Sequence, residues 1–290
     1  MDRLLITGGS GFVGKNLAGF FSPRYSVATT FFQHPGGPAA DSLHLDIRNP
    51  DAVLEVFGRV APTTVIHAAG QKNVRFCEED PAEAHRINAL GTQNVARACR
   101  EVGAHLIYIS TDLVFAGVRG NYEEDEVPKP NLVYGRSKLE GERLAREELP
   151  SVAVCRSGGI YGLGSPLLSW FTKEIDAGRS VECLVDVFNT PTYAPNLGEM
   201  TEVVMRRRLS GIFHTVGSQR VSRFDLFSSY ANSRGIDPSL LKQVSLTQMK
   251  ESLWLQPDSS LSSEKTTGQL GIHFDSVDEG FARLKAEGGL

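Results

Sequence analysis

A tyrosine and a lysine lie four residues apart in the segment Tyr134-Gly135-Arg136-Ser137-Lys138. In a helix, this spacing puts both side chains on one face. A phenol with a pKa near ~10 is a poor proton donor at neutral pH, and a neighbouring ammonium lowers that pKa toward the working range. The pair could therefore protonate a carbonyl group that receives a hydride, and the lysine could also hold a nicotinamide ribose.

Hydroxyl, amide and carboxyl groups elsewhere in the chain could serve the same reaction. Thr111 follows the apolar run 106–110, which has the length of a buried strand, so its hydroxyl could bind the carbonyl oxygen. Asn88 lies in a helical stretch, where it is either a packing amide or a relay that carries protons to Lys138. Asp112 either hydrogen-bonds the substrate or caps the following turn. The predicted catalytic residues are Thr111, Tyr134, Lys138 and Asn88.

A glycine-rich run, TGGSGFVG, occupies residues 7–14 directly after the first apolar run. Gly8 permits the tight turn. Gly11 has no Cβ and lets the backbone approach a pyrophosphate, while Gly14 lets helix and strand pack closely. The helix that comes next would offer free N–H groups and the positive end of its dipole to the phosphates. A strand before and a helix after are the context that a dinucleotide-binding loop requires.

The residues after the second apolar run indicate which nicotinamide cofactor is bound. An NAD site normally has an Asp or Glu there to hold the ribose 2′-hydroxyl. Residues 29–34 contain no acid, which favours NADP over NAD and leaves NAD open. They contain no arginine for a 2′-phosphate either, so Gln33 and His34 are the local candidates. The predicted cofactor-binding residues are Gly8, Gly11, Phe12, Val13, Gly14 and His34, Asp46 and Ile47 at the adenine, Ala68, Ala69 and Gly70 under the ribose, and Tyr134 and Lys138.

Strand-length apolar runs alternate with helical stretches through the first half of the chain. The runs lie at 4–7, 25–31, 65–69 and 106–110, and the helical stretches at 13–21, 51–60 and 81–102. This order predicts right-handed βαβ crossovers and a Rossmann-type, doubly wound parallel α/β sheet. We place the cofactor-binding domain at residues 1–150, with further strands near 152–156 and 211–216, and a smaller C-terminal substrate-binding lobe mainly at 157–290.

Composition narrows the class of protein further. The net charge of −4 over 290 residues argues against a nucleic-acid-binding surface, which is usually basic. The four cysteines form no C-x-x-C pair and the histidines show no ligand spacing, so we expect neither disulfides nor a metal. No apolar run approaches the ~20 residues of a membrane span, and none at the N-terminus suits a signal peptide. We expect a cytoplasmic protein without a membrane partner.

These motifs resemble the extended short-chain dehydrogenase/reductases. The TGGSGFVG loop, HAAG at 67–70, STDLVF at 110–115 and YGRSK at 134–138 carry the likeness, and the dTDP-4-dehydrorhamnose reductases are the most similar subfamily. The resemblance covers nearly the whole chain. It implies NAD(P)H-dependent reduction of a nucleotide-linked keto-deoxysugar, with Tyr134 as proton donor beside Lys138 and Thr111, and a homodimer as one possible assembly. The substrate-binding residues predicted with it are Asp112, Arg156, Pro191 and Thr192.

The chain departs from this subfamily where substrate would lie. Leu113 and Gly159 stand where the subfamily has a tyrosine and a tryptophan. Val187 and Gln256 stand where it has a glutamine and an arginine. These differences would remove stacking surface and positive charge, so they leave the identity of the sugar open without touching the predicted hydride-transfer residues.

Two other functions stay open on the sequence. A nucleotide-sugar epimerase shares the loop and the Tyr/Lys pair and keeps its cofactor bound. The regulatory subunit of methionine adenosyltransferase resembles the same subfamily, so fold and cofactor loop alone do not prove turnover. A dehydratase usually has adjacent Asp-Glu after the active-site threonine, and the sequence Asp112-Leu113 disfavours that reading.

Overall fold

The apolar runs form a seven-stranded sheet in which every neighbouring pair is parallel, in the order β11-β6-β5-β4-β1-β2-β3. The computed structural model describes residues 3–36, 41–248 and 254–289. The order reverses direction beside β1, as expected of a doubly wound Rossmann-type sheet. The strands of this sheet are β1 (Arg3–Thr7), β2 (Ser26–Phe31), β3 (Asp41–His44), β4 (Thr64–His67), β5 (His105–Thr111), β6 (Ala153–Ser157) and β11 (Gly211–His214).

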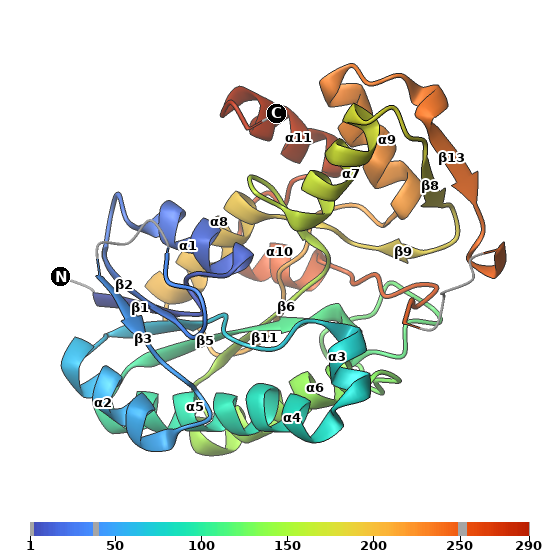
Figure 1. Ribbon diagram of the computed structural model, residues 1–290. Helices are drawn as coiled ribbons and strands as arrows, with labels where there is room; N and C mark the ends of the chain where they lie inside the picture. Colours follow the sequence, from blue (N-terminus) through green and yellow to red (C-terminus); the bar gives the residue numbers. More distant parts are fainter. Residues whose placement is uncertain (1–2, 37–40, 249–253, 290) are drawn as a thin grey trace.

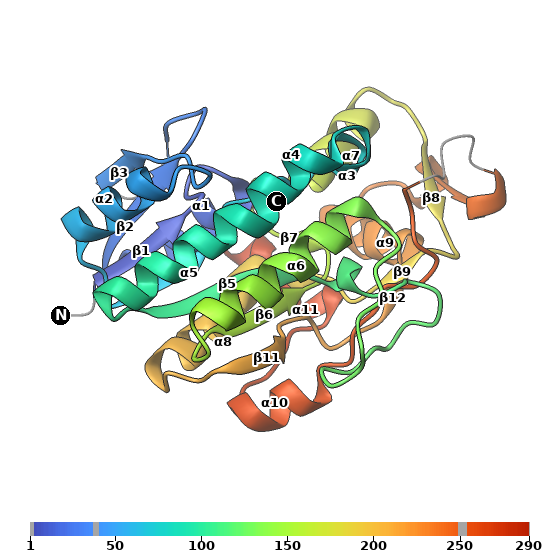
Figure 2. The ribbon, with the colours of Figure 1, turned by 90° about the horizontal axis from the view of Figure 1, so that it is seen from below.

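Helices cover both faces of the sheet (Figure 1). One apolar core joins the sheet to α1, α8 and α10, and a second joins its other face to α2, α5 and α6. Figure 2 shows α5 and α6 side by side across the second face. The bounds are α1 (Phe12–Phe21), α2 (Pro50–Val60), α3 (Val74–Glu79), α4 (Pro81–His85), α5 (Gly91–Val102), α6 (Val133–Glu148), α8 (Ala194–Arg206) and α10 (Glu264–Leu270).

The stretch expected as one helix, 81–102, is continuous but not uniformly α-helical. A π-helical segment, η1 (Arg86–Leu90), separates α4 from α5. Asn88 lies inside this segment and is buried. Such π turns inside α-helices recur at functional sites because they re-aim one side chain without ending the helix.

The C-terminal half also builds a smaller lobe with its own core (Figure 1). Tyr161, Phe171, Phe227 and Phe281 are among its buried residues. Helix α8 falls within the range expected for the lobe but packs on the main sheet, so the exact division stays a prediction. Its elements, with the short strands that join it to the sheet domain, are β7 (Ile160–Tyr161), α7 (Pro166–Asp176), β8 (Val181–Leu184), β9 (Phe188–Asn189), β10 (Thr192–Tyr193), β12 (Val221–Ser222), α9 (Arg223–Arg234), β13 (Leu241–Val244) and α11 (Val277–Ala286).

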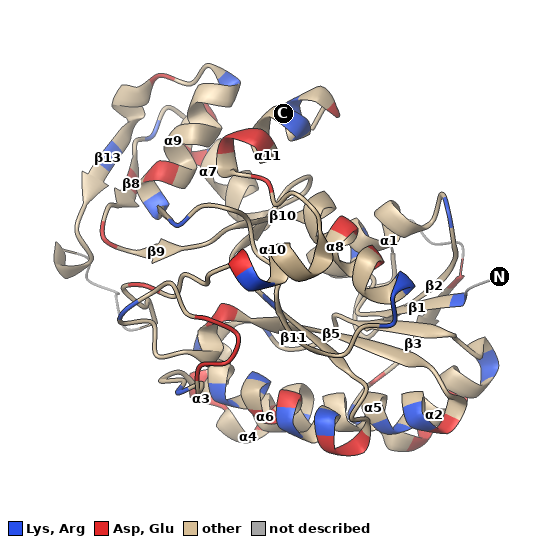
Figure 3. Ribbon diagram, turned by 180° about the vertical axis from the view of Figure 1, so that it is seen from behind, with Lys and Arg blue, Asp and Glu red and all other residues tan. Residues whose placement is uncertain are grey.

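Charges of both signs are interleaved on the helical surface (Figure 3). On α6, Arg143 pairs with both Glu140 and Glu147, and Arg97 and Arg100 of α5 reach Glu148. Pairing of this kind leaves no single-sign stripe along these helices. Within the ranges that the structure describes, no helix has the length and apolarity needed to cross a membrane.

Candidate active site

The glycine loop joins β1 to α1 and opens on a cavity of about 480 Å³. Helix α1 has Gly11 as its N-cap, without a capping side chain or an acid in its first turn. Its first N–H groups are therefore available to an anion. A Cβ on Gly14 would lie 2.2 Å from the carbonyl oxygen of Gly8, and one on Gly8 would lie 2.7 Å from Cα of Ala69. Only glycines allow this backbone to pack so closely, and the resulting cradle fits a dinucleotide pyrophosphate.

The structure gathers the sequence-predicted cofactor residues around this one cavity, except Tyr134 and Lys138, which do not line it. They come from the glycine loop, the ends of β2 and β3, and the turn after β4. The parallel strands bring these segments together because their carboxyl ends share one edge of the sheet. The predicted residues that line the cavity are Gly8, Gly11, Phe12, Val13, Gly14, His34, Asp46, Ile47, Ala68, Ala69 and Gly70.

Arg48 also lines the cavity. It was not predicted from the sequence, because an arginine was considered only in the segment after β2. Its guanidinium makes a bidentate pair with Asp46, from Nε to Oδ1 and from Nη2 to Oδ2, and a second ion pair with Glu83. It also lies 5.0 Å from the centroid of the Phe32 ring. The hydrogen bonds from Arg48 lower the pKa of Asp46. The Asp-x-Arg spacing directly after β3 is the signal that could have found it.

A second cavity of about 310 Å³ continues from the first and holds the catalytic candidates. Phe12, Val13 and the segment 68–72 line both cavities. Thr111 reaches the second one as the last residue of β5, while Tyr134 and Lys138 project from the first turns of α6. The predicted residues brought together in its lining are Asn88, Thr111, Asp112, Tyr134 and Lys138.

Burial dominates the ionisation of the Tyr/Lys pair. It raises the pKa of Tyr134, an effect that the Thr111 hydroxyl reduces and the Asp112 carboxyl reinforces. Burial also lowers the pKa of Lys138 to about 7, against the attraction of Glu142. The expected lowering of the Tyr134 pKa by Lys138 is therefore not what this structure shows. The Lys138 ammonium instead donates to the backbone carbonyl of Ile109 at 2.8 Å.

Asn88 is tied to α6 and to the turn after β4. Its amide donates to the hydroxyl of Ser137 and to the carbonyl of Gln71, both at 2.9 Å, and accepts from the Gln71 N–H at 2.8 Å. These bonds fix the amide orientation beside the catalytic cavity. Among the described residues Asn88 has no direct side-chain bond to Lys138, so its role as a proton relay stays a prediction.

Asp112 is buried in the wall of the same cavity. Burial raises the pKa of its carboxyl to about 6, although bonds from Ser259 and Thr111 favour the charged form. The Ser259 hydroxyl donates at 2.8 Å and the Thr111 hydroxyl at 3.0 Å. A carboxyl held in this way can both orient Thr111 and offer an oxygen to the cavity.

The other predicted substrate residues lie outside the lining of the catalytic cavity. Arg156 is buried within the sheet domain, where its guanidinium makes a bidentate bond to Glu142. The Thr192 hydroxyl donates to backbone carbonyls, and Pro191 is buried with its carbonyl bonded to the N–H of Gly217. The hydroxyl of Thr192 and the carbonyl of Pro191 are bonded within the fold. Arg156 is bonded there through Nε and Nη2, while its Nη1 has no partner among the described residues. These contacts favour a supporting role for the three residues, and their role in substrate binding stays a prediction.

The variant Arg156→Met separates these two interpretations. It leaves Glu142 buried without its partner, and removal of one member of a buried ion pair costs about 3–5 kcal/mol. We therefore expect a large fall in the free energy of unfolding, measured by denaturant titration. Any folded fraction should keep the wild-type KM for substrate. A raised KM with unchanged stability would instead restore the substrate-binding role.

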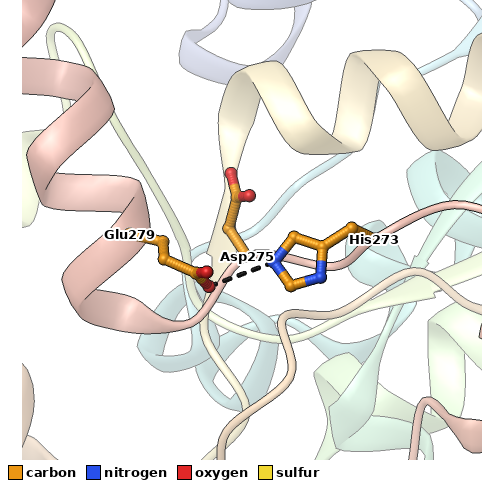
Figure 4. A group of neighbouring side chains, drawn as sticks. All are labelled: His273, Asp275 and Glu279. Carbon is orange, nitrogen blue, oxygen red and sulfur yellow. Dashed lines mark hydrogen bonds and ion pairs between the residues drawn. The ribbon is translucent and has the colours of Figure 1, made fainter.

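Three potential metal ligands lie together at the edge of α11, although no such spacing was visible in the sequence (Figure 4). One ligand atom each of His273, Asp275 and Glu279 lies within 4.8 Å of the others. His273 and Glu279 bond each other at 3.1 Å, while Asp275 bonds Arg283 at 2.6 Å. The bonds within the group and to Arg283 already satisfy these side chains, so the cluster needs no ion to explain it.

A doubly wound sheet, a glycine loop at a bare helix N-terminus and an adjoining cavity with a Tyr/Lys pair define a nucleotide-cofactor-dependent oxidoreductase of the short-chain dehydrogenase/reductase class. The family model described as "RmlD substrate binding domain" matches residues 1–287. The chain belongs to this family.

Individual relatives agree with this assignment. A dTDP-4-dehydrorhamnose reductase of Mycobacterium tuberculosis is 30% identical over 91% of this chain and 86% of the relative. The crystal structure of dTDP-4-dehydrorhamnose reductase from Bacillus anthracis, in complex with NADP, superposes with a TM-score of 0.89 at 27% identity and covers 99% of both chains. Methionine adenosyltransferase 2 subunit beta of Xenopus tropicalis is 28% identical over 83% of this chain and 75% of its own length.

Proposed function

We propose that this protein reduces the keto group of a nucleotide-linked deoxysugar with NADPH. The observation that carries the proposal is the continuity of the two cavities, which puts Tyr134 at the end of the dinucleotide cradle. The names of the relatives support the substrate class, since the mycobacterial and Bacillus proteins are dTDP-4-dehydrorhamnose reductases.

NADP is supported by the charges around the adenine end of the cradle. The segment after β2 brings Gln33 and His34 to the cavity and no acid. The two carboxylates that do line it, Asp46 and Glu83, are both paired with Arg48. Glu83 also pairs with Arg86, so two guanidinium groups balance the two carboxylates and a 2′-phosphate would meet no unpaired acid among the residues that line the cavity. The Bacillus anthracis relative was crystallised with NADP, which agrees with this preference.

The side chains in the second cavity have complementary parts in the reaction. The cofactor, when bound, supplies a hydride to the carbonyl carbon. Tyr134 donates its phenolic proton to the carbonyl oxygen. The Thr111 hydroxyl, whose hydrogen is directed to Asp112 in this structure, rotates to donate to the same oxygen as negative charge develops on it. Lys138 stabilises the phenolate that remains, and Asn88 holds the turn 70–71 and α6 in register.

The sugar itself is proposed only as a class, because the cavity wall differs from the reductases that the sequence resembles. Leu113 and Gly159 line the catalytic cavity, so both differences change its surface. A Cβ on Gly159 would lie 2.6 Å from the amide nitrogen of Asn189, which shows how closely this wall is packed. Gln256 is buried and donates to the carbonyl of Phe115.

The test is a substrate panel. Purified protein would be mixed with NADPH or NADH and nucleotide-linked 4-keto-6-deoxysugars, and reduction followed by loss of nicotinamide absorbance and by mass spectrometry of the product. Turnover with at least one sugar supports the proposal. Cofactor that survives purification together with sugar isomerisation would replace it with an epimerase. If the protein turns over no sugar but forms a stable complex with another enzyme, a regulatory role would replace the reductase proposal. The Xenopus relative is likewise named as a subunit of another enzyme.

The preference for NADPH should depend on Arg48. In Arg48→Gln, Asp46 loses its partner and Glu83 keeps only its pair with Arg86, so the site would repel a 2′-phosphate, while the NADH ribose carries no such group. We expect the ratio of kcat/KM for NADPH to that for NADH to fall about tenfold, corresponding to ~1.4 kcal/mol. Arg59→Gln is the matched control, because Arg59 is exposed on α2 away from the cavity. An unchanged ratio in Arg48→Gln would remove Arg48 from cofactor selection.

A further inference from the structure

Two buried rings behind the catalytic cavity have no part in the chemistry described above. His67 ends β4 and Tyr108 is its register partner on β5. Both side chains are fully buried. Their rings stack with centroids 5.2 Å apart and planes inclined by 21°. A polar imidazole and a phenol placed side by side in a sheet core call for a reason beyond apolar packing, because burying polar groups is costly.

The first reason is the contact with Lys138. Its Nζ lies 4.1 Å from the centroid of the Tyr108 ring and donates to the neighbouring carbonyl of Ile109. An ammonium over an aromatic face is attracted by the ring quadrupole, and the attraction grows where water is excluded. Lys138 is buried, so the Tyr108 ring and one carbonyl replace part of the hydration that its charge has lost.

The second reason for burying these polar rings is that His67 holds the hydroxyl of Thr92, which in turn binds the backbone carbonyl of Asn88. The Thr92 hydroxyl donates to it at 2.7 Å, so the same hydroxyl accepts from Nε2 of His67 at 3.1 Å. Nδ1 of His67 then accepts from the Thr7 hydroxyl at 2.6 Å. These bonds define the Nε2–H tautomer. Burial lowers the pKa of His67 to about 3, so the ring stays neutral beside Lys138.

A close approach of α6 holds the two groups together. A Cβ on Gly141 would lie 2.4 Å from the Asn88 carbonyl oxygen, 2.9 Å from the Tyr108 hydroxyl and 3.4 Å from the Thr92 hydroxyl. The helix that carries Tyr134 and Lys138 therefore rests directly on this layer. Its position depends on the absence of a side chain at residue 141.

We propose that Tyr108 and His67 are positioning residues: the Tyr108 ring holds the Lys138 ammonium in place and favours its charged form, while His67 fixes Thr92 and the Asn88 carbonyl. The inference rests on the proposed function only in that Lys138 serves Tyr134. Neither ring touches the reacting atoms, because both lie behind the cavity lining.

Other charged groups near Lys138 are accounted for. Glu142, on the same helix, favours the ammonium, but it also accepts bonds from Arg156 of β6 and from Ser110 of β5. On the remaining sides stand neutral His67 from β4 and the cavity residues Asp112 and Tyr134. The substitutions used in the test leave all of these groups unchanged, so any shift they produce comes from the ring at residue 108.

The test changes the ring electronics and keeps its shape. Tyr108→Phe preserves the negative face, and the Tyr108 hydroxyl has no hydrogen-bond partner among the described residues. Pentafluorophenylalanine at the same position keeps the shape but reverses the quadrupole. Trace acetylation of Lys138 with acetic anhydride, followed by mass spectrometry across a pH series, reports the Lys138 pKa without any turnover. Thermal unfolding of each variant checks that it is folded.

The expected result is a labelling midpoint that matches wild type in Tyr108→Phe and falls by about one pH unit with the fluorinated ring, because the ammonium is then less favoured. If the protein turns over a sugar, the pH at which kcat falls on the alkaline side of its pH profile should move down by the same amount with the fluorinated ring, while KM stays constant. Equal midpoints in the two folded variants would overturn the inference. A shifted midpoint without turnover by any form, wild type included, would refute the proposed function and leave the role of Tyr108 standing.

Discussion

In Tyr134→Phe we expect kcat for sugar reduction to fall by about 10²–10⁴-fold, the range typical for removal of a positioned general acid. The ring fills the same space, so the buried cavity wall should stay intact. Cofactor affinity, measured by fluorescence of bound NADPH, should change little because the cradle is built from other segments. Thermal unfolding should likewise stay close to wild type, since the substituted ring keeps the apolar contacts of Tyr134 with the neighbouring buried cluster.

The matched control for this change is Tyr25→Phe. Tyr25 lines neither cavity, and its hydroxyl donates to Glu202 at 2.7 Å. We expect full activity in this variant. Retention of most of the activity in Tyr134→Phe would instead assign the proton to another group, and Asp112 would be the next candidate because burial raises its pKa to about 6.

Gly14→Ala should have the second large effect, on cofactor binding. Its Cβ would lie 2.2 Å from the Gly8 carbonyl oxygen and 2.7 Å from Cα of Gly9, both backbone atoms that cannot move aside cheaply. Overpacking of this kind costs about 1–3 kcal/mol. Because the displaced atoms form the phosphate cradle, NADPH affinity should fall by about 10–100-fold, measured by fluorescence titration.

Gly19→Ala on the same helix provides the control. A Cβ there meets nothing within 4 Å, so the substitution adds only helix propensity. We expect unchanged NADPH affinity and a gain of about 0.5–1 kcal/mol in the free energy of unfolding. If Gly14→Ala bound NADPH as tightly as Gly19→Ala, the loop would not be the pyrophosphate cradle.

Most of the sheet domain was predictable because its signals are local. A buried parallel strand needs an uninterrupted apolar run, and the helices between strands show their own periodicity. The runs at 4–7, 65–69 and 106–110 accordingly became β1, β4 and β5 within one or two residues. The π-helical segment 86–90 was missed, since its residues also suit an α-helix and only the packing of Asn88 against α6 distinguishes the two.

The lobe was less predictable because its signals are not local. Its elements are short, and two-stranded pairs such as β7 with β10 join segments about thirty residues apart. The assignment of Arg156, Pro191 and Thr192 to substrate followed a sequence resemblance and stays a prediction. In the structure these residues make bonds within the fold and do not line the catalytic cavity. The position of a residue in a motif does not determine the direction in which its side chain points.

The sequence by itself determined the doubly wound sheet, the glycine loop and the catalytic candidates, because each depends on residue type and spacing within one segment. Only the tertiary structure decided the directions in which the pKa values of Tyr134 and Lys138 shift. It also decided the pairing of Arg48 with Asp46 and Glu83, and the contact of the Lys138 ammonium with the Tyr108 ring. Burial and charge pairing depend on groups that are distant in sequence and become neighbours only when the sheet and its helices pack together.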